Sequence, residues 1–198
     1  MQSPPEGTRR QILEAALETL KQEGFAAATS RAVATRGGFN QALVFYYFGS
    51  MDALLLAALD WTSEERLDAY RAALADARTV DELLAAASRL YREDRDSGHI
   101  SVVSQMIAGS IVRRELAPEM IVRMQPWIDL TEQVLERVLT GAGLPRSIPT
   151  RDLAYAVATF YLGVNLLTHL DPDGTRTDAL VGGLPELETA LAGLLERG

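Results

Sequence analysis

The stretch of residues 29–48 reads TSRAVATRGGFNQALVFYYF, and it decides the fold. Thr29 and Ser30 are natural N-caps, because a hydroxyl at this position accepts a hydrogen bond from a first-turn backbone amide. The residues that follow place Val33 and Ala34 on one side of a helical repeat. The stretch is therefore predicted to begin with a short helix that buries these two side chains.

A glycine pair and an asparagine separate this helix from the next one. Gly37 and Gly38 allow a sharp turn that needs a positive φ or a close approach of two backbones. Asn40 is the next N-cap, and residues 41–47 are predicted to form another short helix that ends before Gly49. Two short helices joined in this way have the geometry of a helix-turn-helix, whose second helix can lie in the major groove of DNA. Two ordinary core helices can share the same spacing.

Helical periodicity extends outward from this stretch over almost the whole chain. The pattern predicts helices over residues 8–22, 30–36, 41–47, 50–77, 80–95, 99–113, 118–140, 150–170 and 185–196. No strand-like alternation and no internal repeat interrupts it. The fold class is therefore all-α. Residues 1–50 are predicted to form a three-helix domain that carries the helix-turn-helix, and residues 51–198 a second helical domain.

The composition excludes several kinds of site. The 198 residues are 47% hydrophobic and 23% charged, so the chain can bury a core. The absence of cysteine excludes disulfides and thiolate metal sites and makes the cytoplasm the expected location. With only His99 and His169, a zinc site would depend on carboxylates, so neither a metal nor another cofactor is expected.

The charge is unevenly distributed along the chain. The formal net charge is −8, which at first argues against a nucleic-acid partner. Residues 1–50, however, hold five basic and four acidic residues, whereas residues 51–198 hold 14 basic and 23 acidic residues. The N-terminal domain is therefore the part of the chain that can approach DNA.

The most apolar stretch is residues 153–170, which is long enough to raise the question of a membrane span. Thr159, Asn165, Thr168 and His169 interrupt it. A buried helix in a helical core is the preferred interpretation, and no membrane partner is expected.

Many spaced residues between Thr8 and Leu59 match a known family pattern. The matching residues are Arg9, Ile12, Leu13, Ala15, Ala16, Leu20, Gly24, Phe25, Thr29, Arg31, Val33, Ala34, Gly38, Phe39, Ser50, Ala53 and Leu54. The run VFYYFGSMDAL at residues 44–54 is similar, position by position, to the pattern LYHYFPSKEAL. By these residues the chain resembles the TetR family. The resemblance implies a dimeric transcriptional regulator that binds double-stranded operator DNA and a small-molecule effector.

The resemblance and the residue chemistry together predict a DNA-binding surface. Arg9 and Arg10 are expected to meet phosphates, because phosphate contacts dominate affinity; solvated helix-end charges are the alternative. Ser30 can touch the DNA backbone or cap its helix, and Arg31 can reach a guanine or a phosphate. The full predicted set is Arg9, Arg10, Ser30, Arg31, Asn40, Gln41, Ala42, Leu43, Tyr46, Tyr47 and Ser50.

The second helix of the motif carries the candidates for base readout. Gln41 can read the N6 and N7 edge of adenine, and Ala42 can touch a thymine methyl group. Leu43 can do the same or pack internally. Tyr46 is expected to face the groove and Tyr47 to donate its hydroxyl to a phosphate, with burial in the core as the alternative for both.

Some positions depart from the family pattern. Met51 stands where the family usually carries a phosphate-binding lysine, so Ser50 and the helix N-terminus would have to serve instead. Phe45 lacks the hydroxyl of the frequent tyrosine, and Phe45 and Phe48 are assigned to the core. Position 41 is often basic in the family. These departures predict modest DNA affinity with a shallow salt dependence.

The resemblance implies dimerisation through the last two long helices, at residues 150–170 and 185–196, packed as a four-helix bundle across a two-fold axis. Ala154, Ala158 and Gly163 would allow a close approach of the helices. An intramolecular core helix is the alternative.

A mostly apolar effector pocket is expected among the helices between residues 54 and 140. A few polar anchors in such a pocket favour an apolar or aromatic effector, although core packing is the alternative for each residue. The candidate lining residues are Tyr70, Tyr91, Gln105, Met106, Met124, Trp127, Thr131, Asn165 and His169.

Three functions compete at this point. The first is a repressor that an effector releases from its operator by shifting the helix that follows the helix-turn-helix. The second is a helical protein-interaction module with weak or lost DNA binding. An enzyme is not expected, because no nucleophile elbow, phosphate loop or paired metal ligands are present. Carboxylates such as Asp94 and Asp96 are assigned to solvated faces.

Overall fold

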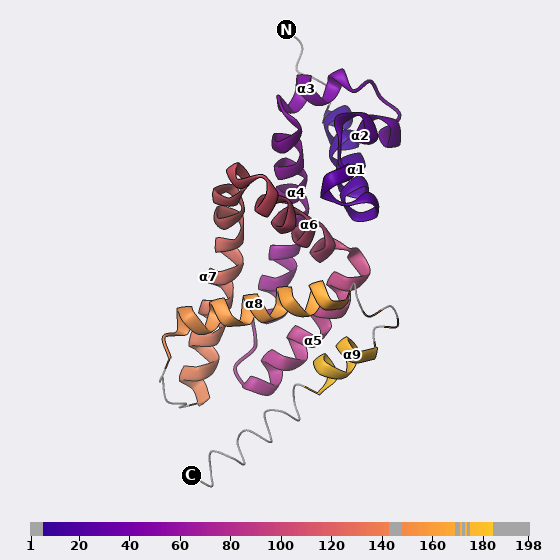
Figure 1. Ribbon diagram of the computed structural model, residues 1–198. Coiled ribbons are helices and arrows are strands. Elements are labelled where there is room, and N and C mark those ends of the chain that lie inside the picture. Colours follow the sequence, from indigo (N-terminus) through magenta and orange to yellow (C-terminus); the bar gives the residue numbers. More distant parts are fainter. Residues whose placement is uncertain (1–5, 143–147, 169–170, 172, 174, 184–198) are drawn as a thin grey trace. The chain divides into compact units, whose positions relative to one another are not determined.

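The structure is a computed structural model that describes residues 6–142, 148–168, 171, 173 and 175–183 (Figure 1). Every regular element in these ranges is a helix, which confirms the all-α prediction. In chain order, the elements are α1 (Glu6–Glu23), η1 (Phe25–Ala27), α2 (Ser30–Gly37), α3 (Ala42–Phe48), α4 (Met51–Leu74), α5 (Val80–Ser97), α6 (His99–Val112), η2 (Arg114–Leu116), α7 (Ala117–Ala142), α8 (Thr150–Thr168) and α9 (Thr175–Gly182).

Most predicted helices agree with the observed ones to within a few residues, but the C-terminal region differs. The predicted helix at 185–196 lies outside the described residues. The helix α9 was not predicted from the sequence, because the residues before it suggest only a turn. One of them, Asp171, caps this helix: its Oδ2 accepts hydrogen bonds from the backbone amides of Arg176 (2.9 Å) and Thr177 (3.2 Å).

The chain divides into two compact units, which are described separately. The first contains residues 1–68 and 98–125, and the second residues 69–97 and 126–198. The first unit therefore includes α6 and the start of α4 as well as the three N-terminal helices. The predicted domains are two continuous stretches that meet at residue 50, whereas each compact unit combines two separate stretches. The boundary at residue 50 remains a prediction.

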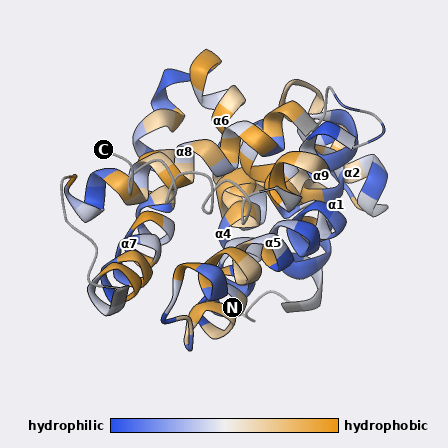
Figure 2. Cartoon of the chain, turned by 90° about the horizontal axis from the view of Figure 1, so that it is seen from below, coloured by the Kyte–Doolittle hydropathy of each residue, from blue (hydrophilic) through white to orange (hydrophobic). Residues whose placement is uncertain are grey.

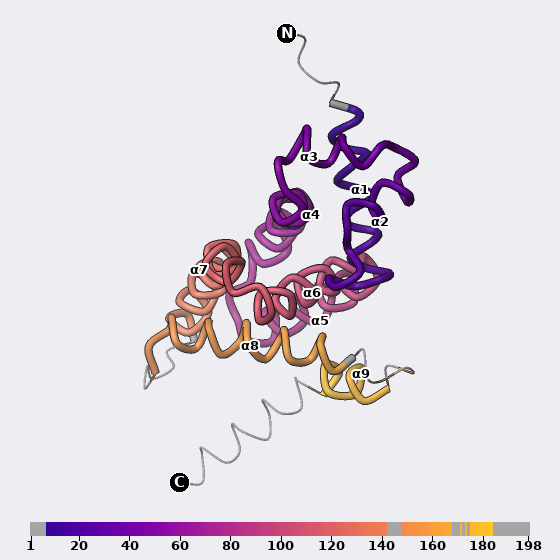
Figure 3. The backbone as a smooth tube through the Cα atoms, turned by 45° about the horizontal axis from the view of Figure 1, so that its top comes forward, coloured from indigo at the N-terminus to yellow at the C-terminus, as the bar shows by residue number. Residues whose placement is uncertain are grey.

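The core of the first unit is built from the apolar stripes of its short helices. Ile12 and Leu20 of α1, Val33 of α2, Val44 of α3 and Leu54 of α4 are all fully buried. Burying a side chain of this kind stabilises a fold by about 1.5–3 kcal/mol relative to leaving it exposed. These residues hold α2 and α3 against α1 and so fix the helix-turn-helix, whose course Figure 3 traces from α1 to α4.

The glycine pair in the turn serves two purposes, one for each residue. Gly38 adopts φ 70°, in the left-handed region, and its amide bonds to the carbonyl of Ala34 at the end of α2. Gly37 instead allows a close approach: a Cβ built there would lie 2.1 Å from the Phe39 ring and 3.0 Å from the Ala15 Cβ. The carbonyl of Gly37 also accepts a hydrogen bond from Gln11 Nε2 at 2.8 Å.

Gly37→Ala is therefore expected to lower the free energy of unfolding by about 1–3 kcal/mol, because the added methyl overpacks the turn. Urea denaturation followed by circular dichroism measures the change. Gly7→Ala is the matched control, since a Cβ at Gly7 has nothing within 4 Å and alanine favours the helix. Equal stability of Gly37→Ala and the unchanged protein would contradict the assigned role of Gly37.

The second unit has its own apolar core between α5, α7 and the end of α4. Leu74, Leu90 and Val138 are among its buried side chains. Arg137 ties α7 to the end of α4, because its guanidinium donates to the carbonyl oxygens of Leu74 (2.5 Å), the last residue of α4, and of Ala77 (3.0 Å), just beyond it. Carbonyls at a helix C-terminus lack intrahelical donors, and here the arginine adds a donor to the turn bond from the Ala77 amide to the Leu74 carbonyl (3.4 Å).

The assignment of Asp94 to a solvated face is wrong. Asp94 is 1% exposed, and its Oδ2 accepts hydrogen bonds from the hydroxyls of Tyr70 and Tyr161, which also lie 2.9 Å from each other. Burial raises the pKa of Tyr161 well above its ordinary value. Asp94 follows Ala86 and Leu90 at a spacing of four, so it falls on the buried stripe of α5 rather than beside exposed Asp96.

No single helix among the described residues is both long enough and apolar enough to span a membrane. The helices α3 and α4 satisfy the length and composition criteria only as a pair, and a bend of 66° separates them.

Candidate nucleic-acid interface

Side-chain caps define where the helices of the motif begin. Thr29 caps α2 by accepting a hydrogen bond from the Ala32 amide (3.2 Å), so the hydroxyl of Ser30 is not the cap. Asn40 Oδ1 accepts from the Ala42 amide (2.9 Å) at the start of α3. Ser50 Oγ accepts from the Ala53 amide (3.0 Å) at the start of α4. Of the predicted DNA-contacting residues, Asn40 and Ser50 therefore have a structural role at a helix start.

The first turns of α3 present one exposed surface. Gln41 and Ala42 are exposed, and Tyr46 is 69% exposed, whereas Val44 on the opposite side is fully buried. Leu43 lies half-buried between them. An amide, a methyl group and a phenol on one exposed helix face can read base edges in a groove.

The assignment of Phe45 to the core is wrong, because its side chain is 50% exposed. The residues from Leu43 to Phe48 are all apolar or aromatic, so the sequence has no periodicity that separates the inner from the outer face. Only Val44 in α3 is fully enclosed. Phe45 thus belongs to the exposed surface of α3, next to Ala42 and Tyr46, and is a surface residue that the sequence analysis missed.

Aromatic and basic side chains pack together beside this surface. Tyr47 is half-buried, and its ring meets the Tyr46 ring edge-on with centroids 5.2 Å apart. Phe48 is half-buried as well, and the Arg9 guanidinium lies 5.2 Å from its ring centroid. Such a cation–π contact orients the guanidinium without neutralising it. Arg9 therefore keeps its charge at the start of α1.

The other predicted cations differ in how they are engaged. Arg10 donates to Glu14 at 2.8 Å and remains 71% exposed, so its charge is partly compensated. Arg31 is exposed on the first turn of α2 and lines a surface hollow of about 600 Å³ together with Thr35 and Arg36. Arg36 itself is held by Glu23 at 2.5 Å.

The N-terminus of α4 lacks the basic side chain of the family pattern. Met51 is the first residue of the helix, and Asp52 follows it. Asp52 forms an ion pair with Arg113, which follows the last residue of α6. The carboxylate of Asp52 is thus neutralised within the same unit. Met51 itself offers no positive charge to a phosphate.

The candidate effector residues do not all belong to one unit. Tyr70, Tyr91, Trp127, Thr131 and Asn165 lie in the second unit, where the Tyr70 and Trp127 rings meet edge-on at 5.1 Å. Tyr91 and Asn165 are buried, and the Asn165 amide donates to the carbonyl of Tyr161 at 2.8 Å. The candidates in the first unit are Gln105, Met106 and Met124; His169 lies outside the described residues.

A hollow of about 870 Å³ lies along α7 in the second unit, and its lining differs from the predicted pocket. It is formed by Asp129, Glu132, Gln133, Glu136, Arg137, Thr140 and Gly141. These side chains are mostly polar, so this hollow does not match the mostly apolar lining expected for an effector pocket.

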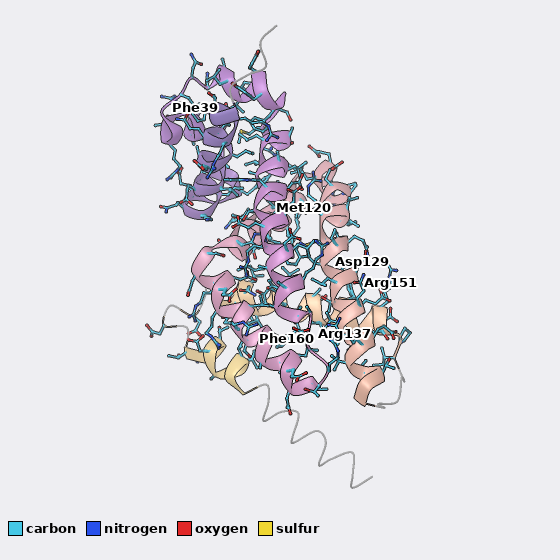
Figure 4. All side chains as sticks on the ribbon, turned by 180° about the vertical axis from the view of Figure 1, so that it is seen from behind. Phe39, Met120, Asp129, Arg137, Arg151 and Phe160 are labelled. Carbon is cyan, nitrogen blue, oxygen red and sulfur yellow. The ribbon has the colours of Figure 1, made fainter. Side chains whose placement is uncertain are left out.

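A separate apolar face runs along α8. Tyr155 is 64% exposed and Leu167 is 61% exposed, and Phe160, labelled in Figure 4, is 48% exposed. Figure 2 shows hydrophobic residues recurring along this helix. A Cβ at Gly163, in the middle of the face, has nothing within 4 Å. Ala154, predicted to face a partner helix, is fully buried on the opposite side of α8 and packs within the unit.

The fold and this surface define a helix-turn-helix protein with an all-helical second part. Residues 12–58 match the family model described as "Bacterial regulatory proteins, tetR family". Over these residues the chain is similar to the DNA-binding domain of the TetR family. It is 41% identical over 51 residues to the HTH-type transcriptional regulator BetI 1 of Chromohalobacter salexigens, which covers 26% of this chain and 25% of that protein. The chain spans only a quarter to about half the length of the curated relatives it matches.

Solved structures extend the similarity of the fold to almost the whole chain. The fatty acid degradation regulator FadR from Bacillus halodurans has a TM-score of 0.75 at 17% identity, covering 94% of this chain and 96% of that one. A regulator from Saccharomonospora viridis in complex with choline has a TM-score of 0.72 at 19% identity, covering 91% and 96%. At these identities the comparison establishes the fold alone.

Proposed function

We propose that the chain is a homodimeric transcriptional regulator that binds double-stranded operator DNA through α2 and α3. The exposed face of α3 carries this proposal. Gln41, Ala42 and Tyr46 stand on that face, and buried Val44 anchors the helix from behind. A rigidly packed short helix with exposed polar and aromatic groups fits the major groove, where Gln41 would pair with adenine.

Phosphate contacts would come from the residues around this face. Arg9 and Arg31 offer exposed guanidinium groups, and Arg10 would exchange Glu14 for a phosphate. The hydroxyl of Tyr47 would donate a hydrogen bond to a phosphate. The hydroxyl of Ser30 would do the same, because Thr29 and not Ser30 caps α2. Asn40 and Ser50, which cap α3 and α4, and Leu43, in the first turn of α3, would lie close to the DNA because these helix starts face it. Such contacts position the protein without reading sequence.

A second copy of the chain would cover the apolar face of α8. Tyr155, Phe160 and Leu167 expose large apolar side chains there, and open Gly163 would admit a partner helix closely. The predicted second dimer helix, residues 185–196, would complete a four-helix bundle. A two-fold dimer would present two α3 helices to the halves of a pseudo-palindromic operator.

In this proposal the chain is a repressor, and an effector releases it from the operator. Binding of the effector would shift α4 and so weaken the binding of DNA. Among solved structures of this fold, a regulator from Saccharomonospora viridis is in complex with choline and FadR from Bacillus subtilis is in complex with stearoyl-CoA. The aromatic pair Tyr70 and Trp127, next to the polar Asp94 cluster, supports an apolar or aromatic effector with a polar anchor. Coupling is reciprocal, so DNA and effector would weaken each other's binding.

A helical interaction module with weak or lost DNA binding is the second candidate. Met51 in place of the family's lysine favours it, because that position then adds no phosphate contact. Binding of a labelled duplex of random sequence, measured by fluorescence anisotropy at low salt, separates the candidates. A regulator binds it weakly and releases it as salt rises, whereas an interaction module does not bind it.

Met51→Lys is expected to strengthen DNA binding several-fold and to steepen the dependence of log K on log salt by about one unit, because it adds one phosphate contact. The same anisotropy titration at several salt concentrations measures both effects. Gln22→Lys, on the exposed last turn of α1, adds the same charge outside the motif and should change neither. An equal response to the two lysines would show that only net charge matters.

A further inference from the structure

One face of α6 contacts the turn that leads into the helix-turn-helix. Gln105, Gly109 and Arg113 are spaced four residues apart, so they follow one another along the same side of the helix. All three meet Phe25, the first residue of η1. These four residues belong to the first unit and are called the α6 clamp below.

Each contact of the α6 clamp uses a different property of Phe25. Gln105 Oε1 accepts a hydrogen bond from the Phe25 backbone amide at 3.0 Å. The Phe25 ring lies close to the backbone at Gly109, where a built Cβ would be 2.5 Å from the nearest ring atoms. The Arg113 guanidinium lies 5.1 Å from the ring centroid. The backbone amide and the ring of Phe25 are therefore both held by α6 and the arginine that follows it.

The backbone next to Phe25 is shaped for this contact. Gly24 adopts φ 79°, which a side chain would strain, and a Cβ there would lie 3.0 Å from Gln105 Oε1. Four residues beyond Phe25, Thr29 caps α2. The anchored turn thus determines where α2 begins.

Arg113 extends the clamp to the other end of the motif. It forms an ion pair with Asp52, in the first turn of α4, directly after α3 and its terminating Gly49. The side chain of Arg113, directly after α6, therefore contacts η1, which precedes α2, and the first turn of α4, which follows α3. The helix-turn-helix is held from both ends by the same face of one helix.

We propose that the α6 clamp sets the orientation of α2 and α3 that operator binding requires. Gln105, Gly109 and Arg113 act through Phe25 and Asp52, so they are positioning residues and not DNA-contacting ones. This proposal rests on the proposed DNA-binding function. It also gives Gln105 a role in place of effector contact.

Gly109→Ala tests the clamp with a single methyl group. Alanine is the better helix former, so apart from the clamp the change would leave the fold as stable or more stable. With the clamp, the methyl displaces the Phe25 ring, and the dissociation constant for DNA is expected to rise on the order of tenfold. The probe is the fluorescein-labelled duplex that the unchanged protein selects from a random pool. Gly182→Ala, where a Cβ meets nothing within 4 Å, is the matched control.

A rescue variant separates positioning from simple damage. Phe25→Ala in the Gly109→Ala background removes all the ring atoms that clash and keeps the backbone amide that donates to Gln105, so it should recover part of the lost affinity. Hydrogen exchange of the amides of residues 29–48, without DNA, should be faster in Gly109→Ala and return toward the original rate in the double variant. This second readout does not depend on DNA binding.

The outcomes distinguish the two proposals. If the unchanged protein selects no duplex, the proposed function fails, and hydrogen exchange alone reports on the clamp contacts. If the protein binds its duplex and Gly109→Ala binds equally well, the clamp is overturned while the function stands. If Gly109→Ala fails to fold, Arg113→Gln decides, because it leaves the helix intact: an unchanged dissociation constant then overturns the clamp.

Discussion

Replacing Gln41 by alanine and Tyr47 by phenylalanine in one chain is expected to abolish sequence-specific DNA binding while the dimer survives. A bidentate contact to adenine discriminates by about 1–3 kcal/mol, and a hydroxyl bound to phosphate contributes about 0.5–1.5 kcal/mol. Together these losses weaken operator binding on the order of a hundredfold. Fluorescence anisotropy with the selected duplex measures the change.

The two substitutions are chosen to spare the fold. Gln41 is exposed, and phenylalanine keeps the ring of Tyr47 that packs edge-on against Tyr46. The matched control is Gln22→Ala, which removes the same amide at an exposed position outside the helix-turn-helix and outside the proposed dimer face. If the control loses as much affinity as the test variant, α3 is not the reading helix.

Leu167→Glu is expected to convert the dimer to a monomer. A two-fold axis would place a carboxylate from each copy in an apolar interface, and burying unpaired charges costs several kcal/mol. Self-association should weaken by about a hundredfold or more, and operator affinity should fall with it because one chain holds only one half-site. Analytical ultracentrifugation measures the mass against the 21.6 kDa of one chain.

Ile121→Glu is the control for the dimer interface. Ile121 is 68% exposed but lies on α7, outside the apolar face of α8. This variant should remain dimeric. A monomeric Ile121→Glu, or a dimeric Leu167→Glu, would contradict the assignment of that face to the dimer.

The sequence predicted most of the helix-turn-helix because local chemistry determines it. Thr29, Gly38 and Asn40 act within a few residues of themselves, through a cap, a left-handed turn and a second cap. The sequence did not reveal that Gly37 is needed for its contact with Phe39, because both a positive φ and a close approach were open explanations.

Residues whose role depends on packing could not be assigned from the sequence. Phe45 lies in an unbroken apolar run, so only the structure shows that it is exposed. Asp94 looks like a surface charge until its spacing from Leu90 is considered, and its two tyrosine partners come from α4 and α8. Gln105 was assigned to an effector pocket, yet its amide oxygen accepts from a backbone amide eighty residues away in the chain.

The most direct test of the account is selection of bound sequences from a random pool of double-stranded DNA, with the purified protein at two salt concentrations. The account predicts recovery of a palindromic motif, because two α3 helices related by a two-fold axis read two half-sites. Enrichment should be weaker at the higher salt concentration, since phosphate contacts supply much of the affinity. Recovery of nothing above background at low salt would contradict DNA recognition by this chain and would favour the interaction module.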